Sequence, residues 1–150
     1  MGVAEVEGAN GGLHTNYEGK TDAAIKALLE DGYDFAYIHV EAPDEMGHQG
    51  SYERKVQAVE YLDERVIKRL TDALNAKGVD YRMLVLPDHP TPVRVRTHTA
   101  DNIPYLLFDS TDLKKENWNY NEKQAAAGGI LIEAGHTLID RLFSKHEKKI

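Results

Sequence analysis

Five acidic and histidine side chains fall into three short stretches of the sequence. They are Asp44 and His48 in APDEMGH, Asp88 and His89 in LPDHP, and His98 in RTHTADNIP. Carboxylate oxygens and imidazole nitrogens are ligands that intermediate divalent cations such as Zn²⁺ and Mn²⁺ accept. Two close metal ions are a common device in phosphoryl chemistry. The five residues therefore indicate a metal-dependent site, although no obvious nucleophile accompanies them.

Each stretch also has an ordinary explanation when it is taken alone. Asp44 and His48 are four residues apart, so one helical turn would put both on the same side, but Asp44 is also a candidate cap for a following helix. Asp88 and His89 lie between two prolines, where the chain leaves regular structure and both side chains can turn to one site, or simply form a turn. His98 stands in a polar loop. The metal hypothesis gains its strength from the three stretches together.

The elements that must position these residues follow from the apolar pattern. Continuous apolar and aromatic runs predict buried strands at residues 34–40, 81–87 and 103–109. Apolar residues at helical spacing predict three helices, the first capped by Thr21 and ending at Gly32, the second over 51–77, and the last over 122–143 with a weak point at its two glycines. The second helix has an expected buried stripe of Val56, Val59, Leu62, Val66, Leu70 and Leu74.

Strands that alternate with helices predict an α/β fold with a mostly parallel sheet. Ligands of such sheets bind outside the carboxyl ends of the strands. Each stretch lies at the end of an apolar run that we expect to be a strand, and His98 stands in the polar loop before residues 103–109. Of the remaining histidines, His39 is expected to be a hydrogen-bonded core residue, and His14, His136 and His146 are expected on the surface or on helices.

Composition excludes several classes of protein. The 150 residues suit one domain with a sizeable core. A net charge of −7 argues against nucleic acid as a partner, and the absence of cysteine excludes disulfides and thiolate metal sites. No apolar run approaches the roughly 20 residues of a membrane span, so no membrane partner is expected. The N-terminus does not have the pattern of a signal sequence, and we expect a cytoplasmic location.

The sequence resembles a known family at specific motifs. The stretches TNYEGK, HVEAPDEMGH, LPDHPTPVRVRTHTADNIPYLLF and EAGH are similar to the cofactor-independent (2,3-bisphosphoglycerate-independent) phosphoglycerate mutases, in the archaeal-type branch whose members also carry the label of homoserine kinase. That family belongs to the alkaline phosphatase superfamily of two-metal enzymes. The resemblance implies a three-layer α/β/α, alkaline phosphatase-like fold with a mostly parallel sheet, of which this chain forms a partial domain.

The resemblance also implies a set of ligands. It places Asp44, His48 and His98 on one metal ion and Asp88 and His89 on a second. The implied cofactors are two divalent ions, Mn²⁺ or Zn²⁺ with Mg²⁺ or Co²⁺ as alternatives, and no 2,3-bisphosphoglycerate. The mixed oxygen and nitrogen ligands leave the native metal open.

The implied reaction moves a phosphoryl group between the 2- and 3-hydroxyls of glycerate through a phosphoserine. Arg94 and Arg96 could contact phosphate bidentately, although a solvated loop explains them equally well. The family's serine nucleophile and inserted substrate-binding domain match nothing here, so we expect residues 1–150 to be a C-terminal part of the metal-binding domain that is inactive alone.

Other functions remain open. One alternative is another metal-dependent phosphotransferase or phosphatase of the same superfamily, including a homoserine kinase. A further alternative is a non-catalytic binding module. The expected partner is a small phosphorylated substrate, and an exposed strand edge would favour self-association of the chain.

Overall fold

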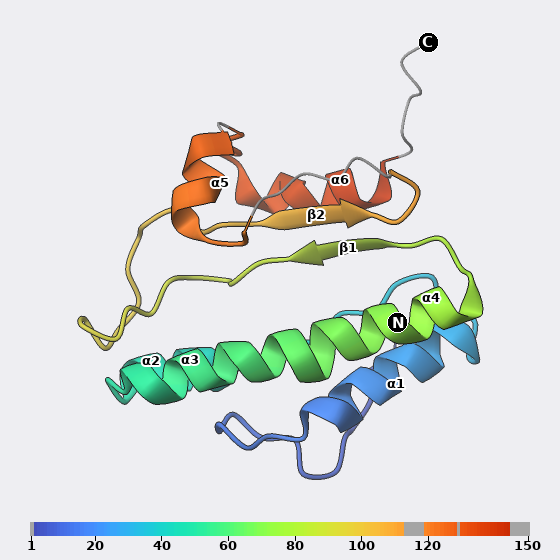
Figure 1. The fold of residues 1–150 in the computed structure, drawn as a ribbon, viewed down its shortest axis with the longest axis horizontal. Coiled ribbons are helices and arrows are strands. Elements are labelled where there is room, and N and C mark those ends of the chain that lie inside the picture. The colour runs from blue at the N-terminus through green and yellow to red at the C-terminus, as the bar shows by residue number, and fades with distance from the viewer. Residues whose placement is uncertain (1, 113–118, 129, 145–150) are drawn as a thin grey trace. The chain divides into compact units, whose positions relative to one another are not determined.

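The computed structural model describes residues 2–112, 119–128 and 130–144, which divide into two compact units (Figure 1). The helical unit consists of Met1–Val79 and Pro90–Ala100. The sheet unit consists of Asp80–His89 and Asp101–Ile150. The chain therefore passes from one unit to the other at three points in the sequence.

Five helical segments build the helical unit. They are α1 (Tyr17–Leu29), α2 (Ala42–His48), α3 (Tyr52–Tyr61), the π-helical segment η1 (Leu62–Lys68) and α4 (Arg69–Lys77). The last three follow one another without interruption and form a single long rod, along which α1 packs (Figure 1). The rod ends at Gly78, whose φ of 66° is the left-handed conformation that glycine adopts most readily. The long helix predicted for residues 51–77 is therefore confirmed.

Helix α1 begins earlier than the sequence pattern predicts. Its cap is Asn16, whose side-chain oxygen accepts a hydrogen bond from the Gly19 amide at 2.9 Å and whose amide donates to the Glu7 carbonyl at 2.8 Å. The predicted cap, Thr21, lies inside the helix and is fully buried. Its hydroxyl donates to the Tyr17 carbonyl one turn earlier, at 2.8 Å. A helical threonine that bonds back in this way is not a cap.

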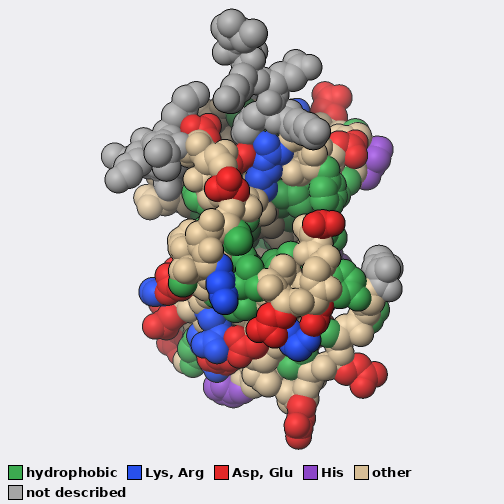
Figure 2. Space-filling view, turned by 90° about the vertical axis from the view of Figure 1, so that its right-hand side faces the viewer, with side chains coloured by type: hydrophobic (Ala, Val, Ile, Leu, Met, Phe, Trp, Pro, Cys, Tyr) green, Lys and Arg blue, Asp and Glu red, His purple; other side chains and the backbone are tan. Residues whose placement is uncertain are grey.

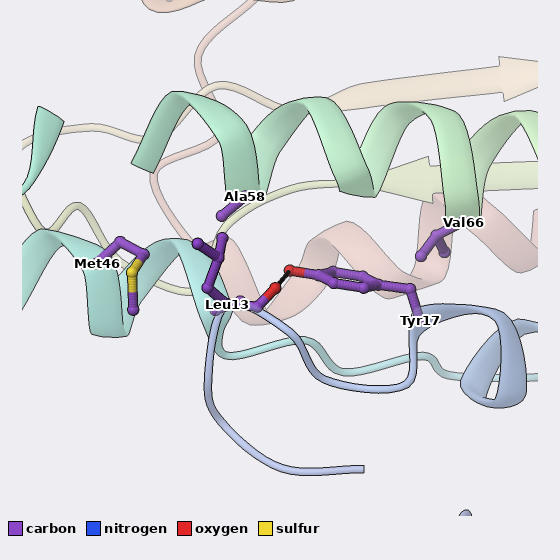
Figure 3. Packing of buried hydrophobic residues seen from close by; sticks show 6 residues of the cluster. Leu13, Tyr17, Met46, Ala58 and Val66 are labelled. Carbon is purple, nitrogen blue, oxygen red and sulfur yellow. Dashed lines mark hydrogen bonds between the residues drawn. The ribbon is translucent and has the colours of Figure 1, made fainter. Parts of the chain in front are cut away.

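The core of the helical unit lies between α1, α2 and the long rod. The Tyr17 ring is completely buried, and its hydroxyl donates to the Leu13 carbonyl at 2.9 Å (Figure 3). Val56 and Val59 of the predicted stripe are 39% and 51% exposed, so the buried face is rotated away from them, and Ala58 is fully buried instead. The buried cluster comprises Leu13, Tyr17, Ala42, Met46, Ala58 and Val66.

The Arg65 side chain joins the rod to α1. Its guanidinium carbon lies 5.0 Å from the ring centre of Tyr17 and 4.8 Å from that of Tyr61, within cation–π range of both. The same group donates two hydrogen bonds to the Glu18 carboxylate, at 2.5 and 2.8 Å. These hydrogen bonds hold the pKa of Glu18 below its usual value. One cation thus fixes two aromatic rings and the first turn of α1.

Residues 34–40 do not form the buried strand that their apolar run predicts. No strand is formed there, and Phe35 and Tyr37 are 45% and 74% exposed, while Ile38 and Val40 pack against the core. A strand needs a hydrogen-bonded neighbour, and within the described ranges only two other segments pair as strands. For the same reason, the expected core residue His39 is exposed.

The sheet unit is built around one antiparallel pair of strands. Strand β1 (Arg82–Val85) runs opposite β2 (Leu106–Asp109), with Arg82 across from Asp109 (Figure 1). An ion pair of 2.6 Å between these two side chains fixes the register, and the Thr111 hydroxyl and amide together with Arg82 hold the pKa of Asp109 well below its usual range. The mostly parallel order predicted from the sequence is not the order of this pair. A parallel pair needs a helical crossover, and residues 86–105 contain no helix.

In the described residues after β2, three short helical segments stand where one long helix was expected. They are α5 (Glu122–Gly128), the 3₁₀ turn η2 (Gly135–Thr137) and α6 (Leu138–Phe143). Helix α5 ends at Gly128, at the predicted weak point, because glycine costs about 1 kcal/mol relative to alanine in a helix interior. The neighbouring Gly129 lies outside the described residues.

On the face shown in Figure 2, acidic and basic side chains lie interspersed with apolar ones. None of the helices in the described ranges is long and apolar enough to cross a membrane.

Replacing Asn16 by alanine should lower the free energy of unfolding by about 1 kcal/mol, because the first turn of α1 loses its cap. Chemical denaturation followed by circular dichroism measures the change. The same substitution at the exposed Asn102 serves as a control and should change stability by less than about 0.5 kcal/mol. Equal effects at the two positions would contradict the assignment of Asn16 as the cap.

Candidate metal centre

Helix α2 places Asp44 and His48 on one face. Pro43 lies in its first turn, where a missing N–H costs nothing, and the acidic Asp44 and Glu45 suit the positive end of the helix. The spacing of four residues brings His48 Nε2 to 3.3 Å from Asp44 Oδ2. Because Asp44 lies inside α2, it does not cap the following long helix, and the alternative explanation of this residue is excluded.

His98 joins this pair from a segment fifty residues further along the chain. Its Nε2 lies 3.2 Å from His48 Nε2 and 3.4 Å from Asp44 Oδ1. The side chains of Asp44, His48 and His98 are 29%, 36% and 49% exposed, so the cluster is open to solvent on one side. These three residues, Asp44, His48 and His98, form the trio.

The three separations match those between ligands of one small cation. Zn–N and Zn–O bonds of about 2.0–2.1 Å in tetrahedral geometry place neighbouring ligand atoms about 3.3 Å apart. In the trio, the two imidazole nitrogens lie 3.2 Å apart, and the Asp44 carboxylate faces His48 through Oδ2 at 3.3 Å and His98 through Oδ1 at 3.4 Å. Two imidazole nitrogens and a carboxylate also form the donor set of many open metal sites. The residues present therefore fit a divalent transition-metal ion or zinc.

A backbone carbonyl determines which nitrogen of His48 faces the trio. His48 Nδ1 lies 3.0 Å from the Arg96 carbonyl oxygen, which can only accept, so Nδ1 carries the proton and donates. With a metal ion bound, the lone pair of Nε2 would then point toward Asp44 and His98. Arg96 has a φ of 58°, which is rare for a residue with a side chain. Its guanidinium lies over Gly50, where an added Cβ would come closer than 3.0 Å.

Thr91 supports the carboxylate of the trio. Its hydroxyl donates to Asp44 Oδ1, and its side chain is 3% exposed. The Lys55 ammonium donates to the Thr91 carbonyl at 2.5 Å. Thr91 approaches α2 directly over Gly47, where a Cβ would come within 3.0 Å of the Thr91 carbonyl oxygen. A glycine is therefore required at this position of α2 for Thr91 to reach Asp44.

Asp88 and His89 lie in the sheet unit and contact each other. His89 Nε2 is 3.2 Å from Asp88 Oδ2, and the His89 amide donates to Asp88 Oδ1 at 3.0 Å. Both side chains thus turn to one side, as expected for an irregular segment between two prolines. Their assignment to a second metal ion stays a prediction.

The predicted phosphate contacts, Arg94 and Arg96, are both exposed. Arg96 packs over Gly50 and contributes its carbonyl to His48, while the phosphate-binding role of both arginines stays a prediction. His14 and His136 are exposed, as expected, and His146 lies outside the described residues. Only His48 and His98 combine with a carboxylate into a group of three in the part of the chain that the structure describes.

Comparison with known proteins identifies the family. Residues 1–145 match the metalloenzyme superfamily. The chain belongs to the metalloenzyme superfamily. It therefore has the alkaline phosphatase-like class of α/β fold, of which the described residues form a part. A family defined by bound metal agrees with the donor set of the trio.

Several superfamily relatives are phosphoglycerate mutases by name. The chain is 40% identical over 146 residues to a probable 2,3-bisphosphoglycerate-independent phosphoglycerate mutase of Geobacter sulfurreducens, covering 97% of this chain and 36% of that protein. It is 43% identical over 131 residues to the 2,3-bisphosphoglycerate-independent phosphoglycerate mutase of Methanosarcina acetivorans, covering 87% and 32%. The resemblance described from the sequence is thereby confirmed. The chain spans about a third of the length of these curated relatives.

A solved structure agrees with the fold of this metalloenzyme chain. The PH0037 protein from Pyrococcus horikoshii is 28% identical and superposes with a TM-score of 0.82, covering 95% of this chain and 42% of that one.

Sequence reasoning missed the residues that support the trio. Neither Thr91 nor Lys55 is among the residues that the sequence pattern singles out. Arg96 acts on His48 through its backbone carbonyl, which a pattern of side chains does not reveal. Gly47 carries the one available signal, because a glycine in a helix allows another backbone to approach closely. The structure identifies the Thr91 carbonyl as the group that approaches.

Replacing Gly47 by alanine should destabilise the chain by about 1–3 kcal/mol and displace Thr91, because the new methyl group overlaps the Thr91 carbonyl. Thermal unfolding monitored by calorimetry tests this expectation. Gly128 of α5 provides the control, since a Cβ there meets nothing within 4 Å. A Gly47→Ala variant as stable as Gly128→Ala would show that the close packing is absent.

Proposed function

We propose that the trio holds one divalent cation and that this cation serves metal-dependent phosphoryl transfer. The observation that supports the proposal is the set of three separations, 3.3, 3.2 and 3.4 Å, between ligand atoms of Asp44, His48 and His98. Zn²⁺ and Mn²⁺ suit this mixed set best, and Co²⁺ and Mg²⁺ are weaker candidates. Asp88 and His89 are proposed as ligands of a second ion in the same reaction.

The chain's own residues have defined tasks in this proposal. The Asp44 carboxylate, His48 Nε2 and His98 Nε2 would bind the ion, the Arg96 carbonyl orients His48, and solvent exposure leaves room for a further ligand. A bound divalent ion would supply positive charge that attracts phosphate oxygens and lowers the pKa of an oxygen nucleophile. The side chains of Arg94 and Arg96 are proposed to contact the phosphate.

The whole reaction that we propose is that of a 2,3-bisphosphoglycerate-independent phosphoglycerate mutase. The names of relatives about 40% identical to this chain support it, as does the metalloenzyme family. The proposed substrate is a small phosphorylated acid, with interconversion of 2- and 3-phosphoglycerate in the cytoplasm. Because the chain spans about a third of those relatives, the reaction belongs to a polypeptide that includes the matching remainder.

Metal binding can be tested on the chain itself by isothermal calorimetry with Zn²⁺ and Mn²⁺. We expect the tighter binding event to disappear in Asp44→Ala and in His98→Ala, because each removes one of three protein ligands. The exposed His14→Ala variant is the matched control and should bind like the parent chain. Nanomolar binding that survives both ligand substitutions would exclude the trio as the site.

The reaction can be tested in a chimera. This chain would replace the matching 146-residue segment of the Geobacter sulfurreducens relative, and conversion of 3-phosphoglycerate would be measured beside ATP-dependent phosphorylation of homoserine. We expect mutase turnover that falls by at least about 100-fold in the His98→Ala chimera and is unaffected by His14→Ala. Turnover of homoserine but not of 3-phosphoglycerate would favour the kinase instead.

A further inference from the structure

We propose that Thr91 is a positioning residue of the trio, whose hydroxyl fixes the orientation of the Asp44 carboxylate toward the two histidines. This inference rests on the proposed metal site. It assigns a role to a residue that neither the sequence pattern nor the family relationship identifies as functional. The geometry that points to it joins a buried hydroxyl, a carboxylate and two supporting contacts.

The Thr91 hydroxyl fixes the orientation of the Asp44 carboxylate. Oγ1 donates to Asp44 Oδ1, which also lies 3.4 Å from His98 Nε2, while Asp44 Oδ2 lies 3.3 Å from His48 Nε2. A carboxylate with one oxygen engaged by a hydrogen bond has a fixed orientation, and here each oxygen then faces one of the two histidines. Hydrogen bonds of this kind to metal ligands typically change metal affinity about 10- to 100-fold.

Thr91 is itself held rigidly, as a positioning residue must be. Its side chain is 3% exposed, its carbonyl accepts from Lys55 Nζ at 2.5 Å, and its methyl group packs over Gly47. The contacts of the carbonyl and the methyl group fix where the hydroxyl points. The side chain therefore has two separable parts, a methyl group that packs on α2 and a hydroxyl that binds Asp44.

This separation gives a test with two independent measurements. Threonine and serine at position 91 keep the hydroxyl, whereas Thr91→Val and Thr91→Ala lack it. Threonine and valine keep the methyl group, whereas serine and alanine lack it. For all four chains, Zn²⁺ affinity is measured by calorimetry, and the stability of the metal-free chain is measured by thermal unfolding.

We expect Zn²⁺ affinity to follow the hydroxyl. Thr91→Ser should bind within about threefold of the parent chain, and Thr91→Val and Thr91→Ala should bind about 10- to 100-fold more weakly. Stability without metal should follow the methyl group, so that serine and alanine are the less stable pair. The serine and alanine chains keep the comparison valid even if Thr91→Val does not fold, since they differ only by the hydroxyl.

Other outcomes overturn the proposal in distinguishable ways. Equal Zn²⁺ affinity of the serine and alanine chains, with the parent binding normally, overturns the role of Thr91 and leaves the metal site standing. Affinity that follows the methyl group and the thermal stability shows that Thr91 acts only through packing. A parent chain that binds no Zn²⁺ removes the metal site and, with it, this inference.

Discussion

Thr91 packs against helix α2 at the position where only glycine leaves room for its carbonyl oxygen. The rest of the candidate site depends on this approach. It brings the segment 90–100 onto the helix that carries Asp44 and His48, and that segment contributes His98 and the Arg96 carbonyl. Van der Waals exclusion at Gly47 therefore decides whether ligand atoms fifty residues apart in sequence can meet.

The contact between Thr91 and α2 is supported by hydrogen bonds from side chains of the long rod. Lys55 comes from the long rod and holds the Thr91 carbonyl, and Arg65 of the same rod joins it to α1 through Glu18 and two tyrosine rings. A charged hydrogen bond to a carbonyl contributes about 1.5–3 kcal/mol when it is made. The rod thus serves both the core and the site, which explains why a helix without any ligand of its own matters for ligand geometry.

The sequence predicted much of the site and less of the sheet, for physical reasons. Asp44 and His48 lie on one helical turn, so their proximity follows from local geometry alone. The end of the rod at Gly78 and the break after Gly128 were likewise local. The strand at residues 34–40 was wrong because pairing is a property of two segments, and the antiparallel order of β1 and β2 was missed because residues 86–105 contain no crossover helix. The cap at Asn16 and the exposure of Val56 and Val59 depended on tertiary packing that a single pattern does not encode.

The trio consists of a local pair and one distant member. Asp44 and His48 stay together in any state that keeps α2, whereas His98 depends on closing a loop of the intervening fifty residues. The entropic cost of closing such a loop grows only with the logarithm of its length, so the cost of bringing His98 to the pair is modest. Because His98 is held by its own segment, a local opening of that segment would remove it while the pair stays in place. Lifting of the segment 90–100 would turn a three-ligand set into a two-ligand set while the core around Tyr17 stays folded. Occupancy of the proposed metal site would thereby depend on how this one short segment packs rather than on global unfolding.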